Sequence, residues 1–167
     1  AVINGGRYAG TACGIAVRND AQLTVNNGYI GSLDTGLYIG DNASAVIHGG
    51  EFDRYEKTSS SSTSQNCAVM MKSTGDLTIY GGSFYGAKQG LFLQSAGQVT
   101  IWNGSFKSRN PREAQQGAMV ISDMENMNIT VYNGTFSGTT GIRSNVKFPL
   151  KDILPNKNSN GMRATGN

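Results

Sequence analysis

The sequence has little cysteine, proline and histidine, and it lacks long apolar runs. Its 167 residues include 2 Cys, 3 Pro and 1 His, and 38% are hydrophobic. The lone histidine, His48, excludes a metal site built on two histidines. No run of about 18 apolar residues occurs, which excludes a membrane-spanning helix, and no signal peptide opens the chain. Few prolines beside 23 glycines favour many short strands joined by tight glycine turns.

The chain also lacks a basic face along its body. The net charge is +3, and the excess of positive charge follows Gly141, where Asp152 is the single acid. The basic residues of that tail are Arg143, Lys147, Lys151, Lys157 and Arg163. A nucleic-acid-binding domain carries Lys and Arg along one face. We therefore expect no nucleic-acid partner and interpret the tail as a solvated segment or a contact with a neighbouring part of the protein.

What the sequence does contain is one short motif that occurs six times. The stretch "DLTIYGGSFYG" (76–86) returns as "QVTIWNGSF" (98–106), "NITVYNGTF" (128–136) and "AVIHGGEF" (45–52), with looser copies at 2–8 and 23–30. Its second corner glycine falls at 6, 28, 50, 82, 104 and 134, so the steps are 22, 22, 32, 22 and 30 residues. Self-similarity at a fixed period predicts a solenoid with a 22-residue unit and two insertions, at about 53–66 and 107–116.

Each unit reads as three short strands. A second apolar phrase, such as "QGLFL" (89–93), precedes the first one in every unit, and 22 residues leave no room for a crossover helix. We predict an all-β, single-stranded parallel coil with three sides and six to seven rungs over residues 1–143. The chain begins inside a repeat, so we expect it to be part of a larger parent chain. We expect residues 144–167 to cover the last rung through Phe148, Leu150, Ile153 and Leu154.

The corner between two strands is always a pair of Gly or Asn, such as Asn103-Gly104, because these residues accept left-handed backbone angles at low cost. Alternation along the strands then assigns the faces. We expect these side chains to point inward in stacked columns: Ile3, Val25, Ile47, Ile79, Ile101 and Val131; Tyr8, Ile30, Phe52, Phe84, Phe106 and Phe136; Ile15, Leu37, Val69, Leu91 and Ala118; Val17, Ile39, Met71, Leu93 and Val120.

These repeats resemble the right-handed parallel β-helix of the pectate-lyase-like superfamily. They are most similar to the "GGTF" repeats of large bacterial surface proteins, here "YGGSF", "WNGSF" and "YNGTF". The resemblance implies a right-handed coil and an extracellular or cell-surface location. It specifies a fold rather than an activity, because one fold hosts many functions.

The resemblance also implies where an enzyme of this fold would act, namely the outer face of the "GLFL" strands. Glycoside hydrolysis needs two carboxylates, and a calcium-dependent lyase needs clustered acids. The expected outward positions there carry none: Ala16, Tyr38, Met70, Phe92 and Met119, then Arg18, Gly40, Lys72, Gln94 and Ile121. The nearest acids lie in turns: Asp34, Asp41, Glu113, Asp123 and Glu125. We predict no catalytic residue, metal or cofactor.

The two cysteines occupy equivalent positions two rungs apart. Cys13 and Cys67 should therefore lie roughly 9–10 Å from one another, given the strand spacing. A disulfide needs α-carbons within about 7 Å. We predict two buried, reduced thiols.

Two outward stripes remain as candidate binding surfaces. One is Tyr80, Trp102 and Tyr132, extended by His48 and flanked by the threonines Thr24, Thr78, Thr100 and Thr130. The other is Tyr38, Met70, Phe92 and Met119. Aromatic rows can stack on sugar rings or seat a partner protein, but cross-strand aromatic pairs also stabilise a sheet by themselves. Both interpretations stay open at this point.

Three functions are compatible with these features. The first is a non-catalytic stalk or adhesive segment of an extracellular bacterial surface protein, which binds a glycan or a host surface protein. The second is a polysaccharide lyase or glycoside hydrolase of the pectate-lyase-like fold. The third is a phage fibre module, in which trimer contacts would cover the apolar stripes. Six to seven rungs span only roughly 30 Å, which counts against the enzyme.

Overall fold

The computed structural model describes residues 1–54, 66–94, 97–109, 117–122, 128–144 and 162–164. In these ranges the chain is built from strands and forms no helix. It follows that no described segment could cross a bilayer as a helix. The predicted insertion at about 53–66 and most of the one at 107–116 fall outside these ranges.

The strands form three parallel sheets, which we name sheets A, B and C. Sheet A contains β1 (Val2–Ile3), β4 (Gln22–Val25), β7 (Ser44–Ile47), β10 (Leu77–Ile79), β13 (Gln98–Ile101) and β16 (Asn128–Val131). Sheet B contains β2 (Arg7–Gly10), β5 (Tyr29–Ser32), β8 (Glu51–Arg54), β11 (Ser83–Gly86), β14 (Ser105–Ser108) and β17 (Thr135–Ser137). Sheet C contains β3 (Cys13–Val17), β6 (Thr35–Asp41), β9 (Cys67–Ser73), β12 (Gln89–Leu93), β15 (Gly117–Ile121), β18 (Ile142–Ser144) and β19 (Met162–Ala164).

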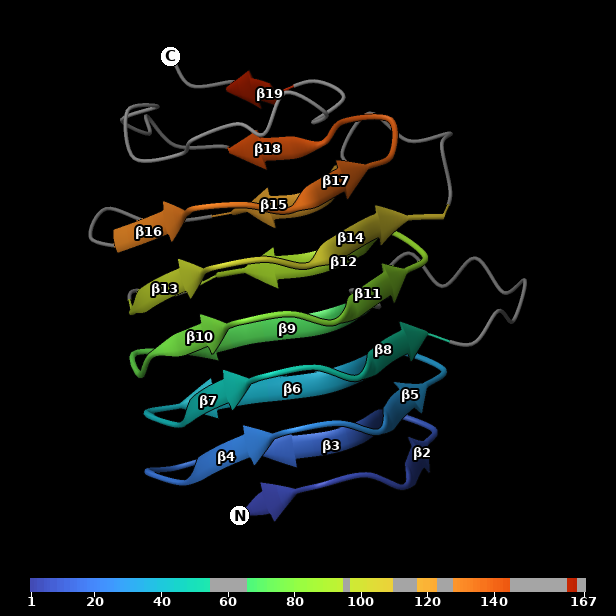
Figure 1. The fold of residues 1–167 in the computed structure, drawn as a ribbon, viewed down its shortest axis with the longest axis vertical. Coiled ribbons are helices and arrows are strands. Elements are labelled where there is room, and N and C mark those ends of the chain that lie inside the picture. Colours follow the sequence, from blue (N-terminus) through green and yellow to red (C-terminus); the bar gives the residue numbers. More distant parts are fainter. Residues whose placement is uncertain (55–65, 95–96, 110–116, 123–127, 145–161, 165–167) are drawn as a thin grey trace.

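Each turn of the chain visits sheets A, B and C in order and then rises to the next rung (Figure 1). The result is the predicted single-stranded, right-handed parallel β-helix, in which the rungs stack along the long axis from the N-terminal to the C-terminal end. The registers confirm the repeat. Ile79 pairs with Ile101 and Phe84 with Phe106, each 22 residues on, and Phe52 pairs with Phe84 across the 32-residue step.

The corner between sheets A and B explains the Gly/Asn pair. The second residue of every pair is a glycine with positive φ: Gly6, Gly28, Gly50, Gly82, Gly104 and Gly134. The first residue needs no such backbone angle, and where it is Asn27 or Asn103 its Oδ1 accepts the N–H of the following glycine at 2.8 or 2.9 Å. The prediction is therefore confirmed for the glycine, whereas the asparagine acts as a cap.

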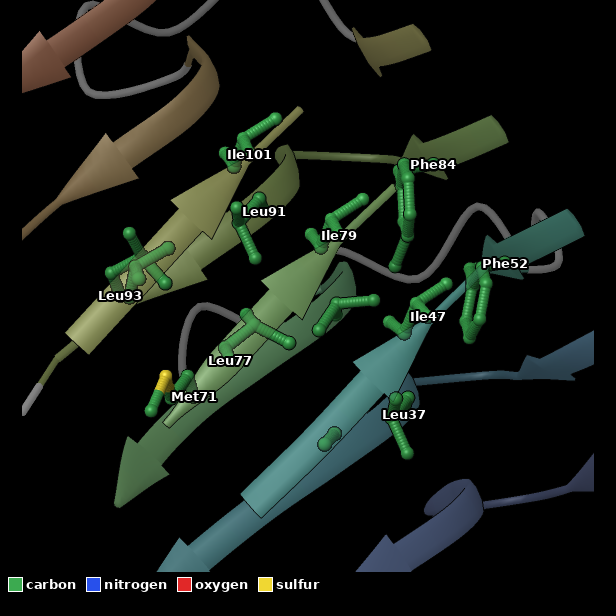
Figure 2. Close-up of a cluster of buried hydrophobic side chains, with 14 of the residues drawn as sticks. Leu37, Ile47, Phe52, Met71, Leu77, Ile79, Phe84, Leu91, Leu93 and Ile101 are labelled. Atoms are coloured by element: carbon green, nitrogen blue, oxygen red, sulfur yellow. The ribbon is translucent and has the colours of Figure 1, made fainter. Parts of the chain in front are cut away.

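The core is a narrow column between the three sheets. Phe52, Phe84, Phe106 and Phe136 stack with ring centroids 4.9, 4.6 and 4.9 Å apart and nearly parallel planes. Figure 2 shows two of these rings beside Ile47, Ile79 and Ile101 from sheet A, with Leu37 and Leu91 from sheet C. Like residues lie on like residues because parallel strands pair rung over rung.

One predicted register is wrong by one residue. We expected Ala118 and Val120 to point inward and Met119 and Ile121 outward. Instead, Leu91 pairs with Met119 and Leu93 with Ile121, and both Met119 and Ile121 are fully buried in the core. Ala118 does belong to the main core, whereas Val120 packs in a separate apolar cluster. A shift of one residue exchanges the two faces of a strand. After Gly117 this strand is apolar throughout, so alternation could not reveal the shift.

The first rung departs from one expectation, and the last described strands extend sheet C. Tyr8 keeps its register with Ile30, but it is 38% exposed because it belongs to the first rung. At the other end β18 continues sheet C and β19 pairs with it in parallel, Ile142 with Met162. The four apolar residues that we expected to cover the last rung, Phe148, Leu150, Ile153 and Leu154, lie outside the described residues.

Candidate binding surface

The candidate surface is built on the residue that follows each strand of sheet A. This position is occupied by Asn4, Asn26, His48, Tyr80, Trp102 and Tyr132. From Asn26 onward its backbone N–H donates to the carbonyl of the preceding rung, for example Tyr80 to Ile47 and Trp102 to Ile79, both at 2.7 Å. These hydrogen bonds extend the sheet by one residue and hold the six side chains in one outward column.

The last four side chains of that column form a continuous ring stack, which we call the aromatic ladder: His48, Tyr80, Trp102 and Tyr132. Successive ring centroids are 4.9, 6.2 and 4.2 Å apart, and the ring planes differ by 3°, 5° and 11°. Tyr80, Trp102 and Tyr132 are 46%, 45% and 48% exposed. Both predictions hold: the row is outward, and His48 is a surface residue within it.

The stacking decides which parts of the rings reach solvent. Neighbouring rings cover one another's faces, so it is chiefly the ring edges that remain open to solvent. Tyr80 and Trp102 are the exception. Since rungs lie about 4.8 Å apart, their centroid distance of 6.2 Å with nearly parallel planes means that the rings are displaced sideways. Part of each ring face is therefore uncovered.

Toward the N-terminal end the column becomes polar. Asn26 donates from Nδ2 to Oδ1 of Asn4 at 2.7 Å, so the two amides form a ladder of their own. Amide ladders and ring ladders satisfy the same stacking geometry. The aromatic part of the column therefore begins at His48. The number of stacked rings depends on which residue each rung places in this column.

The sheet beside the ladder carries no Lys or Arg and a single acid. Across the six strands of sheet A and the column that follows them, no Lys, Arg, Asp or Glu occurs. The exposed Asp76 directly precedes β10, and its Oδ1 accepts the N–H of Gln98 at 3.2 Å. The other outward positions are mostly hydroxyls and amides: Gln22, Ser44, Gln98 and Asn128; Thr24, Val46, Thr78, Thr100 and Thr130. Sheet B differs, because its outer face includes Arg7, Glu51, Asp53 and Lys107. Sheet A thus presents hydroxyls and amides with one carboxylate and no basic side chain.

The second predicted stripe is not an open surface. Tyr38 is half-buried, Met70 is 8% and Phe92 6% exposed, and the outward position of the next rung belongs to Val120 at 3%. These residues and Cys67 form a second apolar cluster outside sheet C. Met119, which we assigned to this stripe, lies in the main core instead. The stripe is covered, and it is not part of the candidate surface.

Both cysteines are free, as predicted, but the prediction that both are buried is wrong for Cys13, which lies near the N-terminal end of the coil. Cys13 and Cys67 share one column with Thr35 between them, and the Thr35 Oγ1 lies 3.9 Å from the Cys67 sulfur. Burial raises the pKa of Cys67 to about 12. Cys13 is only half-buried, although burial and the Asp34 carboxylate also raise its pKa. Neither thiol is activated as a nucleophile.

The described residues contain no group of three or more His, Cys, Asp or Glu that could hold a metal ion. Two of the turn acids cap backbone groups instead. Asp41 accepts the N–H of Asn19 at 3.0 Å, and Asp34 accepts that of Asn66 at 3.4 Å. Glu113, Asp123 and Glu125 lie outside the described residues.

One ion pair, between a buried carboxylate and an exposed arginine, escaped the sequence analysis. Arg109 lies 3.1 Å from Asp53 and sits over the ring of Tyr85 at 5.6 Å. Asp53 is 8% exposed on the outer face of sheet B. The partners are 56 positions apart in sequence, and no motif links them. Only the stacking of β8 beneath β11 and β14 brings them together.

In comparisons with known proteins, the chain matches no family model, no curated protein and no solved structure. The architecture described above therefore rests on the structure, and the function must be argued from the surface of the coil.

Proposed function

We propose that this chain is a non-catalytic β-helix module of an extracellular bacterial surface protein, and that its aromatic ladder binds glycan. The observation that carries this proposal is an exposed row of stacked rings at the edge of a hydroxyl-rich sheet without Lys or Arg. Threonine, glutamine and asparagine side chains both donate and accept hydrogen bonds, as sugar hydroxyls do. Aromatic rings offer the apolar contact that the C–H groups of a sugar ring need.

The extracellular bacterial origin, the membership of a larger surface protein and the "GGTF" repeat type rest on the resemblance of the repeats. The tolerance of the fold for added rungs suits a stalk, since each rung contacts only its neighbours. A host surface protein is the other occupant that such a row could seat, because exposed aromatics are enriched in protein interfaces.

The alternative of a polysaccharide lyase or hydrolase lacks support in the described residues. Its groove would lie outside sheet C, where Met70, Phe92 and Val120 are buried apolar side chains. A fibre module would hide the ladder in a trimer, so light scattering of the purified protein separates that alternative from a monomeric glycan-binding module.

The proposal is tested by replacing the central ring. Trp102→Ala should abolish or weaken by about tenfold the binding of glycans found on an array, because two stacking contacts are lost. The single tryptophan also reports binding directly through its fluorescence. The matched control is Tyr29→Ala, which removes an aromatic from the outer face of sheet B. Binding of no glycan by the wild-type chain, or equal loss in both variants, would contradict the proposal.

A further inference from the structure

The geometry points to one ligand class and one orientation: an uncharged, linear glycan that lies along the coil axis on the aromatic ladder, with one sugar residue per rung. This inference rests on the proposed function and specifies the ligand of the same surface. Two observations carry it, namely the absence of Lys and Arg from sheet A and the direction in which the rings repeat.

The absence of Lys and Arg selects against anionic ligands. No such side chain stands in sheet A or its outward column to pair with a uronate, a sulfate or a phosphate. An acidic glycan would lose hydration there without a compensating ion pair, and the carboxylate that directly precedes β10, Asp76, would repel it. A neutral glycan instead meets side-chain hydroxyls and amides that can donate to and accept from its own hydroxyl groups: Ser44, Thr78, Gln98, Thr100, Asn128 and Thr130.

The direction of the ladder selects the orientation. The rings repeat along the coil axis at the rung spacing of about 4.8 Å, which is comparable with the length of one pyranose residue in an extended chain. A glycan along the axis therefore meets an equivalent ring edge, with its flanking threonine or valine, at every sugar. A glycan that lies across the sheet, parallel to one strand, would meet a single ring and then only the outward side chains of that strand.

The displaced pair of rings supplies the strongest contact. Because Tyr80 and Trp102 are separated by 6.2 Å, part of each ring face is open to the C–H groups of a sugar. The other two pairs, at 4.9 and 4.2 Å, leave mainly ring edges. We therefore expect the sugar between Tyr80 and Trp102 to contribute more than its neighbours.

The test is a length series of neutral linear oligosaccharides, from one to six sugars, taken from glucan, xylan, mannan and galactan, with oligogalacturonides of equal length as the charged probe. Tryptophan fluorescence or calorimetry measures affinity. We expect each sugar to tighten binding by about three- to tenfold, with a plateau at four sugars, which is the number of stacked rings. Oligogalacturonides should bind at least about tenfold more weakly.

Two variants change the length of the ladder. Tyr132→Ala removes the last ring and should move the plateau from four sugars to three. Asn26→Tyr adds a ring beneath His48 and should move the plateau to five sugars. Misfolding could not lengthen the binding site in this way. Both variants are compared with the wild type by circular dichroism.

The outcomes separate the two proposals. Glycan binding that does not depend on length, or a plateau that neither variant moves, overturns the axial orientation but leaves glycan binding in place. Equal affinity for oligogalacturonides overturns the neutral class. Binding of no member of the panel overturns both this inference and the proposed function.

Discussion

At the scale of single residues, the corner glycines are the positions where the fold leaves least choice. Gly50 has φ of +107°, and a Cβ there would lie 2.8 Å from the carbonyl oxygen of Gly28. That carbonyl accepts the N–H of Glu51 at 2.8 Å, so it cannot move without breaking the ladder between rungs. Backbone angle and space thus both require glycine.

Gly50→Ala should lower the free energy of unfolding by about 1–3 kcal/mol or more, because a side chain at positive φ is strained. Urea denaturation of the purified protein measures the change. The matched control is Gly49→Ala in the same corner, where φ is not positive and the nearest atom to a new Cβ, the Asn26 carbonyl oxygen, is 3.2 Å away. An equal loss in the two variants would show that the positive φ is not the cause.

Cys67 illustrates how burial alone can make stability depend on pH. Its thiol has an ordinary pKa of 9.0, which burial raises to about 12. Above about pH 9 the unfolded chain loses the thiol proton while the folded chain keeps it. The contribution of this thiol to stability is therefore complete below that pH and decreases as the pH rises toward 12.

Cys67→Ala should make the fall in stability between about pH 8 and about pH 10.5 shallower than in the wild type, since the titrating group is gone. Urea midpoints at the two pH values measure the difference. Cys13→Ala serves as the control and should change the slope less, because Cys13 is only half-buried. Identical slopes for all three proteins would mean that the Cys67 thiol does not titrate differently on folding.

At the scale of strands, each corner separates two aromatic columns with opposite environments. Phe84 on β11 is fully buried between Phe52 and Phe106, whereas Tyr80 after β10 is 46% exposed between His48 and Trp102. The two rings belong to the same rung, and the centroid distances to their neighbours are 4.9 and 4.6 Å for Phe84 and 4.9 and 6.2 Å for Tyr80. They differ in whether the ring edge meets the core or solvent.

Phe84→Ala should therefore cost about 3–5 kcal/mol of unfolding free energy, since it leaves a cavity in the core. Tyr80→Ala should cost about 0.5–1.5 kcal/mol, the worth of an exposed stacked pair. Chemical denaturation of both variants gives the comparison. A larger loss for Tyr80→Ala than for Phe84→Ala would mean that the ladder is chiefly a structural element, which would weaken the case for binding.

For some strands, but not for all, the sequence predicted correctly which residues face the core. Ile79 and Ile101 each follow a threonine that points outward, and their inward orientation was predicted correctly. The strand Gly117–Ile121 has no such alternation, and there the prediction placed Met119 outside when it lies in the core. Period-2 alternation reports a face only when one face is polar.

At the scale of the molecule, the repeat places the same type of residue at the same position of successive rungs, and these residues together form a long surface. Because each rung repeats the last, a tyrosine or tryptophan in one column position becomes a ladder of four stacked rings. The same repetition stacks threonines beside them and leaves sheet A without Lys or Arg. A surface that is periodic along one axis suits a ligand with the same periodicity, and a linear polymer has one.

The sequence by itself determined the coil, the corners and the exposed row, because a 22-residue period, a Gly/Asn pair and an alternating pattern are local signals that every rung repeats. Only the tertiary structure decided which outward stripe is open. Tyr38, Met70 and Phe92 look as outward as Tyr80 and Trp102 in sequence, yet the first three lie in a second apolar cluster and the other two are half exposed. The Asp53–Arg109 pair and the displaced rings of Tyr80 and Trp102 were equally hidden. Such contacts depend on how distant segments and neighbouring rungs pack, which no local pattern records.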